Sequence, residues 1–198
     1  MIPTLLFLAL SFKVVGIDCA ACGPPVVKAL SAVPGVKDVK VDTNTGMATV
    51  DVPPNFDKAK LHAALVNAGF EMEQDFAPLP AEVVKTLDIE SFNGRTRIDL
   101  PKLAVPGKIT LVDFYADWCG PCKVLETRIE RYMQAHPNVA LRRLDIAHWD
   151  NVAAHQASDL GATALPYVRV YDAKGKFVTA VTGGMWDEML GAIDKAGK

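Results

Sequence analysis

The sequence predicts two small domains in a chain of 198 residues: an α+β domain in the order βαββαβ, then an α/β domain with a mixed sheet. Half of the residues are hydrophobic, which is enough apolar material for two packed cores. Along both halves, apolar residues alternate between strand-like and helix-like spacing. A proline-rich stretch, Ala77-Pro78-Leu79-Pro80, separates the two patterns and is typical of a short, stiff linker.

The first domain is assigned to residues 12–76. Its first helix begins at Pro24-Pro25, where a missing N–H costs little, and ends at Pro34-Gly35. Its second helix ends at Gly69. Strands are expected at residues 12–18, 36–42, 47–52 and 70–76. This order is the split βαβ, or ferredoxin-like, pattern.

Residues 1–11 are a short, mostly apolar stretch with two interpretations. Ala9-Leu10-Ser11 has the small-x-small pattern of a signal-peptide cleavage site, although no Lys or Arg precedes the apolar run. We expect export to the periplasm or cell envelope, with cleavage after Ser11. The alternative is a ragged N-terminal strand in a cytoplasmic protein.

The second domain is assigned to residues 94–198, with residues 77–93 as the linker. The run ITLVDFY at 109–115 is nearly all apolar, as expected of a central strand buried on both faces. A helix, a second strand at 139–146 and another helix near 150–160 follow it. A hairpin at 167–181 and a final helix complete an α/β unit with a mixed sheet.

The overall charge and hydropathy exclude two classes of function. The formal net charge is −2, which argues against a general nucleic-acid binder, because phosphate binding needs an excess of Lys and Arg on one face. No apolar run approaches the roughly 20 residues that cross a bilayer. We therefore expect no nucleic-acid partner and no stable membrane span.

All four cysteines lie in two Cys-x-x-Cys pairs, and the second pair has the features of a redox site. Cys119 follows the buried-type strand at the position where a helix begins, so free N–H groups and the helix dipole can stabilise its thiolate. Cys122 lies one turn further on and can close a disulfide with it. Pro121 is tolerated in the first turn. This arrangement suits attack on a substrate disulfide by Cys119 and release by Cys122.

At these residues the chain resembles the thioredoxin family. The stretch VDFYADWCGPCK at 112–123 is similar to the family's active-site signature, and ALPYV at 164–168 is similar to its cis-proline segment. The resemblance implies a thioredoxin fold whose redox cofactor is the disulfide itself, with no other cofactor. It implies these site residues: Cys119 as nucleophile, Cys122 as resolving thiol, Asp113 as buried proton acceptor, Trp118 as shield, Gly120 and Pro121 between the cysteines, and Pro166 beside the substrate groove.

Two features of the motif bear on its chemistry. Burial should raise the pKa of Asp113, which suits a proton acceptor, whereas the alternative is a purely structural buried carboxylate. The family commonly has a Lys near this acid, and Arg143 stands at the matching place. The Gly120-Pro121 pair resembles thioredoxin itself, a reductant at about −270 mV, and not the periplasmic oxidase at about −120 mV. We therefore expect a disulfide reductase.

The first pair, Cys19 and Cys22, lies between the first strand and first helix of the ferredoxin-like unit. Two thiolates on such a loop can hold one soft ion; Cu(I) is the best match, and Zn or another thiophilic ion is the alternative. Here GIDCAAC resembles the motif of heavy-metal-associated domains, although Ile17 replaces the usual Met and Gly23-Pro24-Pro25 is unusual after the second cysteine. The alternative is a degenerate domain whose cysteines form a structural or regulatory disulfide.

A single zinc site shared by both pairs is rejected. Zinc ribbons separate their cysteine pairs by about 15–20 residues. In this chain 96 residues lie between Cys22 and Cys119. Each pair also has its own domain context.

The sequence thus predicts a thiol-disulfide oxidoreductase that carries a thiol-based metal site and acts in copper-type metal handling. Its expected partners are disulfide-containing or metal-binding proteins and an upstream thiol reductant. Its substrates would include its own Cys19/Cys22 pair, because a metal ligand must be a thiolate. The alternatives are a metal carrier or sensor whose second domain mainly docks partners, and a general reductase whose first domain only recognises them.

Overall fold

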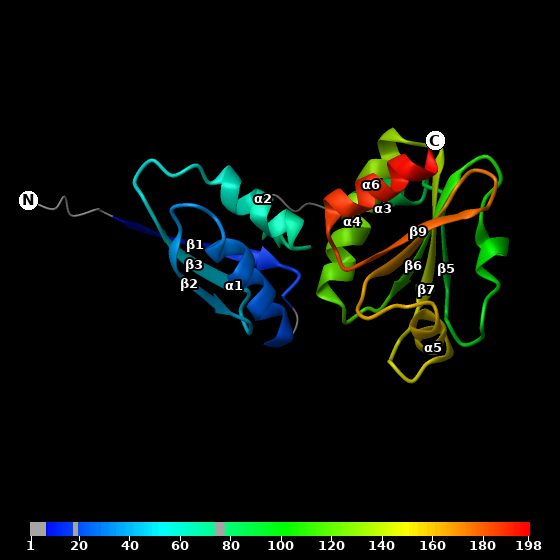
Figure 1. Cartoon of the computed structure of the whole chain (residues 1–198), viewed down its shortest axis with the longest axis horizontal. Helices are drawn as coiled ribbons and strands as arrows, with labels where there is room; N and C mark the ends of the chain where they lie inside the picture. Colours follow the sequence, from blue (N-terminus) through cyan, green and yellow to red (C-terminus); the bar gives the residue numbers. More distant parts are fainter. Residues whose placement is uncertain (1–6, 18–19, 74–77) are drawn as a thin grey trace, which may run out of the picture. The chain divides into compact units, whose positions relative to one another are not determined.

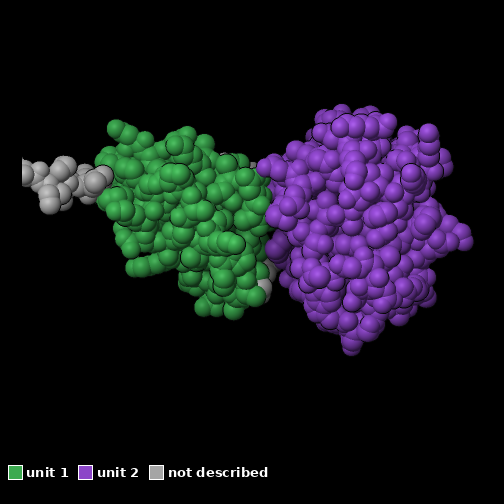
Figure 2. Space-filling view, viewed as in Figure 1, with its two compact units in different colours: residues 1–77 green, residues 78–198 purple. Residues whose placement is uncertain are grey.

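The computed structural model describes residues 7–17, 20–73 and 78–198. The chain divides into two compact units, residues 1–77 and 78–198, shown in green and purple in Figure 2. Each unit has its own sheet and its own hydrophobic core. We therefore describe each unit by itself.

The first unit is a four-stranded antiparallel sheet in the order β2-β3-β1-β4 with two helices (Figure 1). Buried side chains of α1 and α2, among them Leu30 and Leu65, pack with Val14 and Val50 of the sheet. This is the predicted βαββαβ arrangement. Its elements are β1 (Leu8–Val15), α1 (Gly23–Ser31), β2 (Lys37–Asp42), β3 (Met47–Val52), α2 (Ala59–Asn67) and β4 (Glu71–Met72).

Two strand boundaries in this unit differ from the prediction. β1 begins at Leu8, four residues before the predicted start, and Leu8–Ser11 pair with β3. Leu10 and Phe12 pack against the core from alternate positions, so the strand pattern continues into the apolar N-terminal stretch. β4 is only Glu71–Met72, because it pairs with just the last two residues of β1 before Gly16 turns the chain away. Residues 74–76 of the predicted strand lie outside the described residues.

The second unit is a five-stranded mixed sheet in the order β5-β7-β6-β8-β9. The neighbours β5, β7 and β6 run parallel, whereas β8 and β9 run antiparallel to their neighbours. The elements are α3 (Ala81–Val84), β5 (Ile89–Phe92), η3 (Leu100–Leu103), β6 (Ile109–Tyr115), α4 (Gly120–Ala135), β7 (Val139–Asp145), α5 (Val152–Asp159), β8 (Tyr167–Tyr171), β9 (Phe177–Thr182) and α6 (Trp186–Ala196).

Helices cover both faces of this sheet. On one face, Leu125 and Ile129 of α4 and Met189 of α6 pack against Leu111 and its neighbours. On the other face, α5 and η3 pack against Phe114 and its neighbours. Figure 1 shows α4 and α6 together on one side of the sheet. The near-continuous apolar sequence of β6 follows from its burial on both faces.

The stretch predicted as a linker, residues 77–93, is partly structured. α3 and β5 lie within it, and Ile89–Phe92 pair in parallel with Leu141–Leu144 of β7. The prediction of a linker up to residue 93 was therefore wrong. The error has a physical cause: β5 is a short edge strand with one weakly apolar face, so its sequence lacks the strong alternation of a buried strand.

Among the helices of the described residues, none is both long and apolar enough to cross a membrane.

Candidate active site and metal-binding loop

The second cysteine pair lies at the junction of β6 and α4. Cys119 and Cys122 form a disulfide, with their Cα atoms 5.2 Å apart. Cys119 is the N-cap of α4, and its Sγ accepts a hydrogen bond from the backbone N–H of Cys122 at 3.2 Å. Pro121 fits because the first turn of a helix needs no N–H from that position. The sequence therefore places this pair at the helix start, as predicted.

The two sulfur-bearing residues differ in accessibility. Cys119 is 5% exposed and Cys122 is 1% exposed, so a substrate reaches Cys119 more easily. At the N-terminus of a 16-residue helix, unpaired N–H groups and the helix dipole favour a thiolate at Cys119 after reduction. The arrangement is chemically suited to attack by Cys119 and resolution by Cys122.

Trp118 directly precedes Cys119 of the disulfide in the sequence. Its indole Nε1–H donates to the backbone oxygen of Ala147 in the loop after β7. Its ring contacts the ring of Trp149, with the ring centroids 6.2 Å apart. The sequence analysis did not single out Trp149, because its loop carries no motif and only the fold brings it beside Trp118.

The Leu165–Pro166 bond is cis, as predicted from the ALPYV segment. Leu165 packs against the same hydrophobic cluster that contains Cys119 and Cys122. Pro166 is buried, and its carbonyl accepts a hydrogen bond from the N–H of Gly183 at 2.8 Å. The structure thus brings this distant segment to the disulfide.

Asp113 lies in the middle of β6 and is almost fully buried. Burial raises its pKa from 3.8 to about 7; the Arg143 guanidinium lowers it and the charge of Glu126 raises it further. Asp113 lies two residues after Leu111 in β6, so its side chain points to the same sheet face as Leu111, the face that α4 covers. A carboxyl group with a pKa near neutrality can take up and return a proton at physiological pH.

Arg143 lies directly opposite Asp113 in the β6–β7 register. Its guanidinium pairs closely with Glu126 of α4 and stacks 3.7 Å from the ring centroid of Tyr115. Among the described residues, Oδ1 of Asp113 and Nε of Arg143 have no hydrogen-bond partner. In the described part of the chain the Arg143 cation pairs with Glu126, and the unpartnered Oδ1 of Asp113 is able to hold a proton. The sequence analysis did not find Glu126, because helical spacing alone does not show which strand residue it faces.

Replacing Glu126 with Gln should lower the pKa of Asp113 and so shift the pH profile of disulfide reduction to lower pH. At a fixed pH on the slope of the profile, we expect the rate to change by about a few-fold. The charge of Glu126 raises that pKa, and its loss would also leave Arg143 without its counter-charge. The measurement is kcat/KM against pH. Glu130→Gln is the matched control, because Glu130 is a buried acid on the same helix that also interacts with Arg143 and Glu126 but is not among the charges that shift the pKa of Asp113. An unchanged profile for Glu126→Gln would contradict this role.

The first cysteine pair is described only in part. Cys22 ends the short 3-10 turn Ala20–Cys22 and is the N-cap of α1, with Pro at the first helical positions. It also packs against the hydrophobic core of the unit. Cys19 lies outside the described residues. Cys22 is disulfide-bonded in this structure, so it can serve as a thiolate ligand only after reduction. Once reduced, a cysteine at a helix start is a suitable ligand for a soft ion. Among the described residues, no cluster of three or more His, Cys, Asp or Glu forms a metal site.

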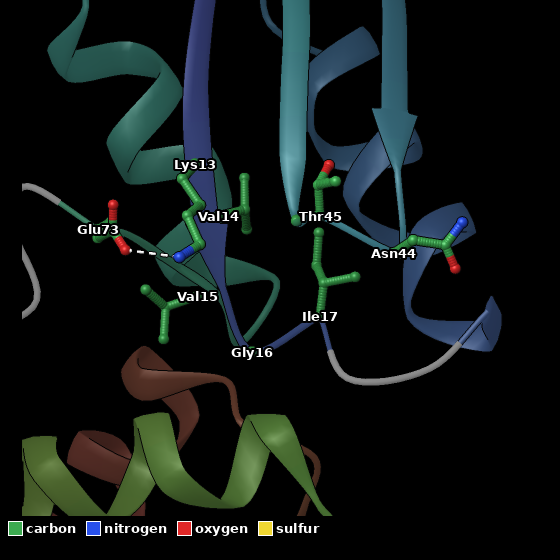
Figure 3. A pocket seen from close by; sticks show the side chains of 9 residues that line it. Lys13, Val14, Val15, Gly16, Ile17, Asn44, Thr45 and Glu73 are labelled. Carbon is green, nitrogen blue, oxygen red and sulfur yellow. Dashed lines mark hydrogen bonds and ion pairs between the residues drawn. The ribbon is translucent and has the colours of Figure 1, made fainter.

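The strand that leads into this loop borders an open pocket of about 580 Å³ (Figure 3). Gly16 and Ile17, which follow β1, face the turn at Asn44 and Thr45 across the pocket. Ile17 is buried in the core, where the sequence analysis noted it in place of the usual Met. An ion pair of 2.8 Å between Lys13 and Glu73 closes one side of the pocket. The described residues on the two sides of Cys19, Ile17 and Cys22, thus both pack into the core of the first unit.

The fold and the disulfide define a protein of the thioredoxin-fold class, with a CxxC pair at the start of the helix that follows the central strand. Residues 101–195 match the family model "Thioredoxin", and residues 11–71 match the model "Heavy-metal-associated domain". Thioredoxin-1 of Saccharomyces cerevisiae is 32% identical over 89 residues, which are 45% of this chain and 82% of that protein. The chain belongs to the thioredoxin family.

Other relatives match over less of their length. Thioredoxin F of Oryza sativa chloroplasts is 32% identical over 123 residues, which are 61% of this chain and 63% of the relative. The chain therefore spans less than two thirds of that curated relative. A crystal structure of thioredoxin f from spinach chloroplast is 27% identical with a TM-score of 0.45, covering 55% of this chain and 93% of that one.

Proposed function

We propose that this protein is a thiol-disulfide oxidoreductase that works as a disulfide reductase. The observation that carries the proposal is the Cys119–Cys122 disulfide at the start of α4, with Cys119 the more accessible. The Cys119 thiolate attacks one sulfur of a substrate disulfide and expels the other as a thiolate. Cys122 then loses its proton and attacks Sγ of Cys119, which releases the reduced substrate and closes the protein disulfide. An upstream thiol reductant returns two electrons to the pair.

The proposed direction, reduction, is supported by the residues between the cysteines. Gly120 and Pro121 are the residues that thioredoxin has between its two cysteines, and the low reduction potential of thioredoxin makes it a reductant. Asp113 supports the same chemistry, because a buried carboxyl with a pKa of about 7 can accept the proton that Cys122 releases.

We further propose that Cys19 and Cys22 bind one soft metal ion, Cu(I) in the first instance. The match of residues 11–71 to the heavy-metal-associated domain supports this, as does the position of Cys22 at the start of α1. When bound, the metal is cargo and supplies no chemistry to the disulfide exchange. The proposed task of the second unit is to keep such thiol pairs reduced, because only thiolates can load the ion.

In the full chain with Cys119→Ser and Cys122→Ser, we expect one Cu(I) to bind per molecule in competition with a chromogenic chelator. Cys19 and Cys22 are then the only cysteine thiols left in the chain. The control has all four cysteines replaced by serine and should lose binding by on the order of 10³-fold or more. Equal Cu(I) binding by the two variants would remove metal from the proposed function.

The coupling between the two pairs has its own readout. After both pairs are oxidised, a limiting supply of dithiol should restore Cu(I) binding faster in the wild-type chain than in the Cys119→Ser/Cys122→Ser variant. The tether between the units gives each pair a high effective concentration at the other. Equal rates of recovery would mean that Cys119 does not reduce the Cys19/Cys22 pair and acts only on disulfides of other proteins.

We propose an oxidising compartment of the cell envelope as the place of action, because thiol pairs need protection there. The apolar stretch at residues 1–11 supports this. Leu8–Ser11 belong to β1 and pair with β3, so cleavage after Ser11 would remove part of the sheet. The N-terminal residue of the mature protein decides between export with cleavage at Ser11 and a retained strand.

A further inference from the structure

Two tryptophans in contact lie beside the disulfide, and each is about half exposed to solvent. Trp118 is 46% exposed and Trp149 is 53% exposed, and their ring centroids are 6.2 Å apart. We call these two side chains the tryptophan pair. Large aromatic rings exposed side by side are typical of a binding surface, because a fold that only needed stability would bury them.

Hydrogen bonds fix the ring of Trp118 and the backbone turn that carries Trp149. The indole Nε1–H of Trp118 donates to the carbonyl of Ala147, and the N–H of Ala147 donates to Oδ1 of Asp145 at 2.7 Å. The loop that carries Trp149 is closed by a further bond, from the N–H of Asn151 to the carbonyl of His148 at 3.0 Å. The ring of Trp118 and the backbone of the turn at Trp149 are therefore held before a ligand binds, which lowers the entropy cost of ordering this surface.

The two chain segments that carry the tryptophan pair are acidic in sequence. The two segments that carry it, residues 116–118 and 145–151, contain Asp117, Asp145 and Asp150 and no Lys or Arg. Asp145 and Asp117 both act on Tyr115, whose pKa is raised first by burial and further by these acids, against the lowering effect of Arg143. Arg143 itself is paired with Glu126, so its charge is largely compensated.

We propose that the tryptophan pair binds a Lys or Arg side chain next to the target cysteine of the substrate polypeptide, which makes Trp149 a specificity-determining residue. The inference rests on the proposed reductase function, because a substrate sulfur that reaches Cys119 must lie against the surface that Trp118 borders. A cation over the face of a tryptophan is attracted by the ring, and nearby carboxylates add to that attraction. Apolar rings with acids around them therefore favour a basic neighbour over an acidic one.

The experiment uses the reduced full-length chain and three peptide disulfides. Each is a symmetric dimer of a short peptide whose one cysteine lies between two arginines, two leucines or two glutamates. One turnover converts the peptide disulfide to two thiols and forms the Cys119–Cys122 disulfide, so thiol release gives kcat/KM directly. The variants are Trp149→Ala and Trp149→Phe. The control is Phe177→Ala, an exposed aromatic side chain at the opposite end of the sheet.

We expect the wild-type chain to prefer the arginine peptide, with a preference that falls as salt is added. Trp149→Ala should lower kcat/KM for the arginine peptide by about 10-fold and for the leucine peptide by less. Trp149→Phe should restore part of the loss, since a phenyl ring is a weaker cation binder. Phe177→Ala should behave as wild type.

Three results would overturn the inference. An equal loss on all three peptides would mean that Trp149 supports the fold of the loop and not substrate choice. A wild-type preference for the leucine or glutamate peptide would mean that the tryptophan pair does not recognise a Lys or Arg side chain. A wild-type chain that reduces none of the peptides would overturn the proposed reductase function, and the inference with it.

Discussion

Replacing Cys119 with serine should abolish the reduction of insulin disulfides by this chain, lowering the rate by on the order of 10³-fold or more, to that of the reductant alone. A serine hydroxyl cannot attack a disulfide at neutral pH, and Cys122 is almost fully buried and so cannot replace Cys119. The measurement is the rate at which insulin precipitates when its chains separate, with dithiothreitol as electron donor.

Cys122→Ser is the matched control, because it keeps the attacking thiol and removes the resolving one. It should also stop turnover, but with a different product: a stable mixed disulfide between Cys119 and the substrate, visible by non-reducing electrophoresis. Cys119→Ser should form no such adduct. Reductase activity that survives in Cys119→Ser would favour the alternative in which the second unit mainly docks partners.

The sequence was sufficient for those features of the site that depend on local chain geometry. Cys119, Pro121 and Cys122 are consecutive in a strand-to-helix turn, so their spacing alone predicts a pair at the start of a helix. The run 109–115 predicts the central strand, because burial on both faces leaves no polar alternation. The βαββαβ order of the first unit follows from its turn and helix-stop residues for the same local reason.

Features that depend on register between distant segments could not be predicted in the same way. Glu126 and Arg143 meet because α4 lies over β7, and no periodicity in either segment specifies that contact. Trp149 lies beside Trp118 because the parallel strands β6 and β7 end at the same edge of the sheet, and each tryptophan is in the segment that follows its strand. The edge strand β5 was missed because pairing on one side only leaves a weak hydrophobic pattern.

Asp113→Asn should slow the release of the mixed disulfide by about 10-fold or more near pH 7, while the first attack by Cys119 stays as fast as in wild type. Asparagine has nearly the shape of aspartate but cannot accept the proton that Cys122 must lose. The defect should shrink at alkaline pH, where a free thiol, with a pKa of about 8.5, loses its proton to water. Stopped-flow measurement of the two steps separates them, and a defect in the attack step alone would contradict this role.

The same substitution should stabilise the oxidised protein at alkaline pH. The pKa of Asp113 is raised from 3.8 to about 7 in the folded chain, so at intermediate pH the folded state holds a proton that the unfolded state has lost. Stability from this group is therefore fully present below the unfolded pKa and is lost as the pH rises through the folded pKa, by on the order of 4 kcal/mol in all. Asparagine carries no such titration.

Urea denaturation of the oxidised wild type and of Asp113→Asn at about pH 4 and about pH 9 measures the difference directly. The other titrating groups are common to both chains, so they largely cancel in the comparison. Asp113→Asn should gain on wild type between the two pH values, because only the wild type must ionise a carboxyl that lies buried beside Arg143 and Glu126. A difference that does not change with pH would mean that Asp113 is ionised in the folded protein throughout, paired with Arg143, and could not serve as the proton acceptor for Cys122.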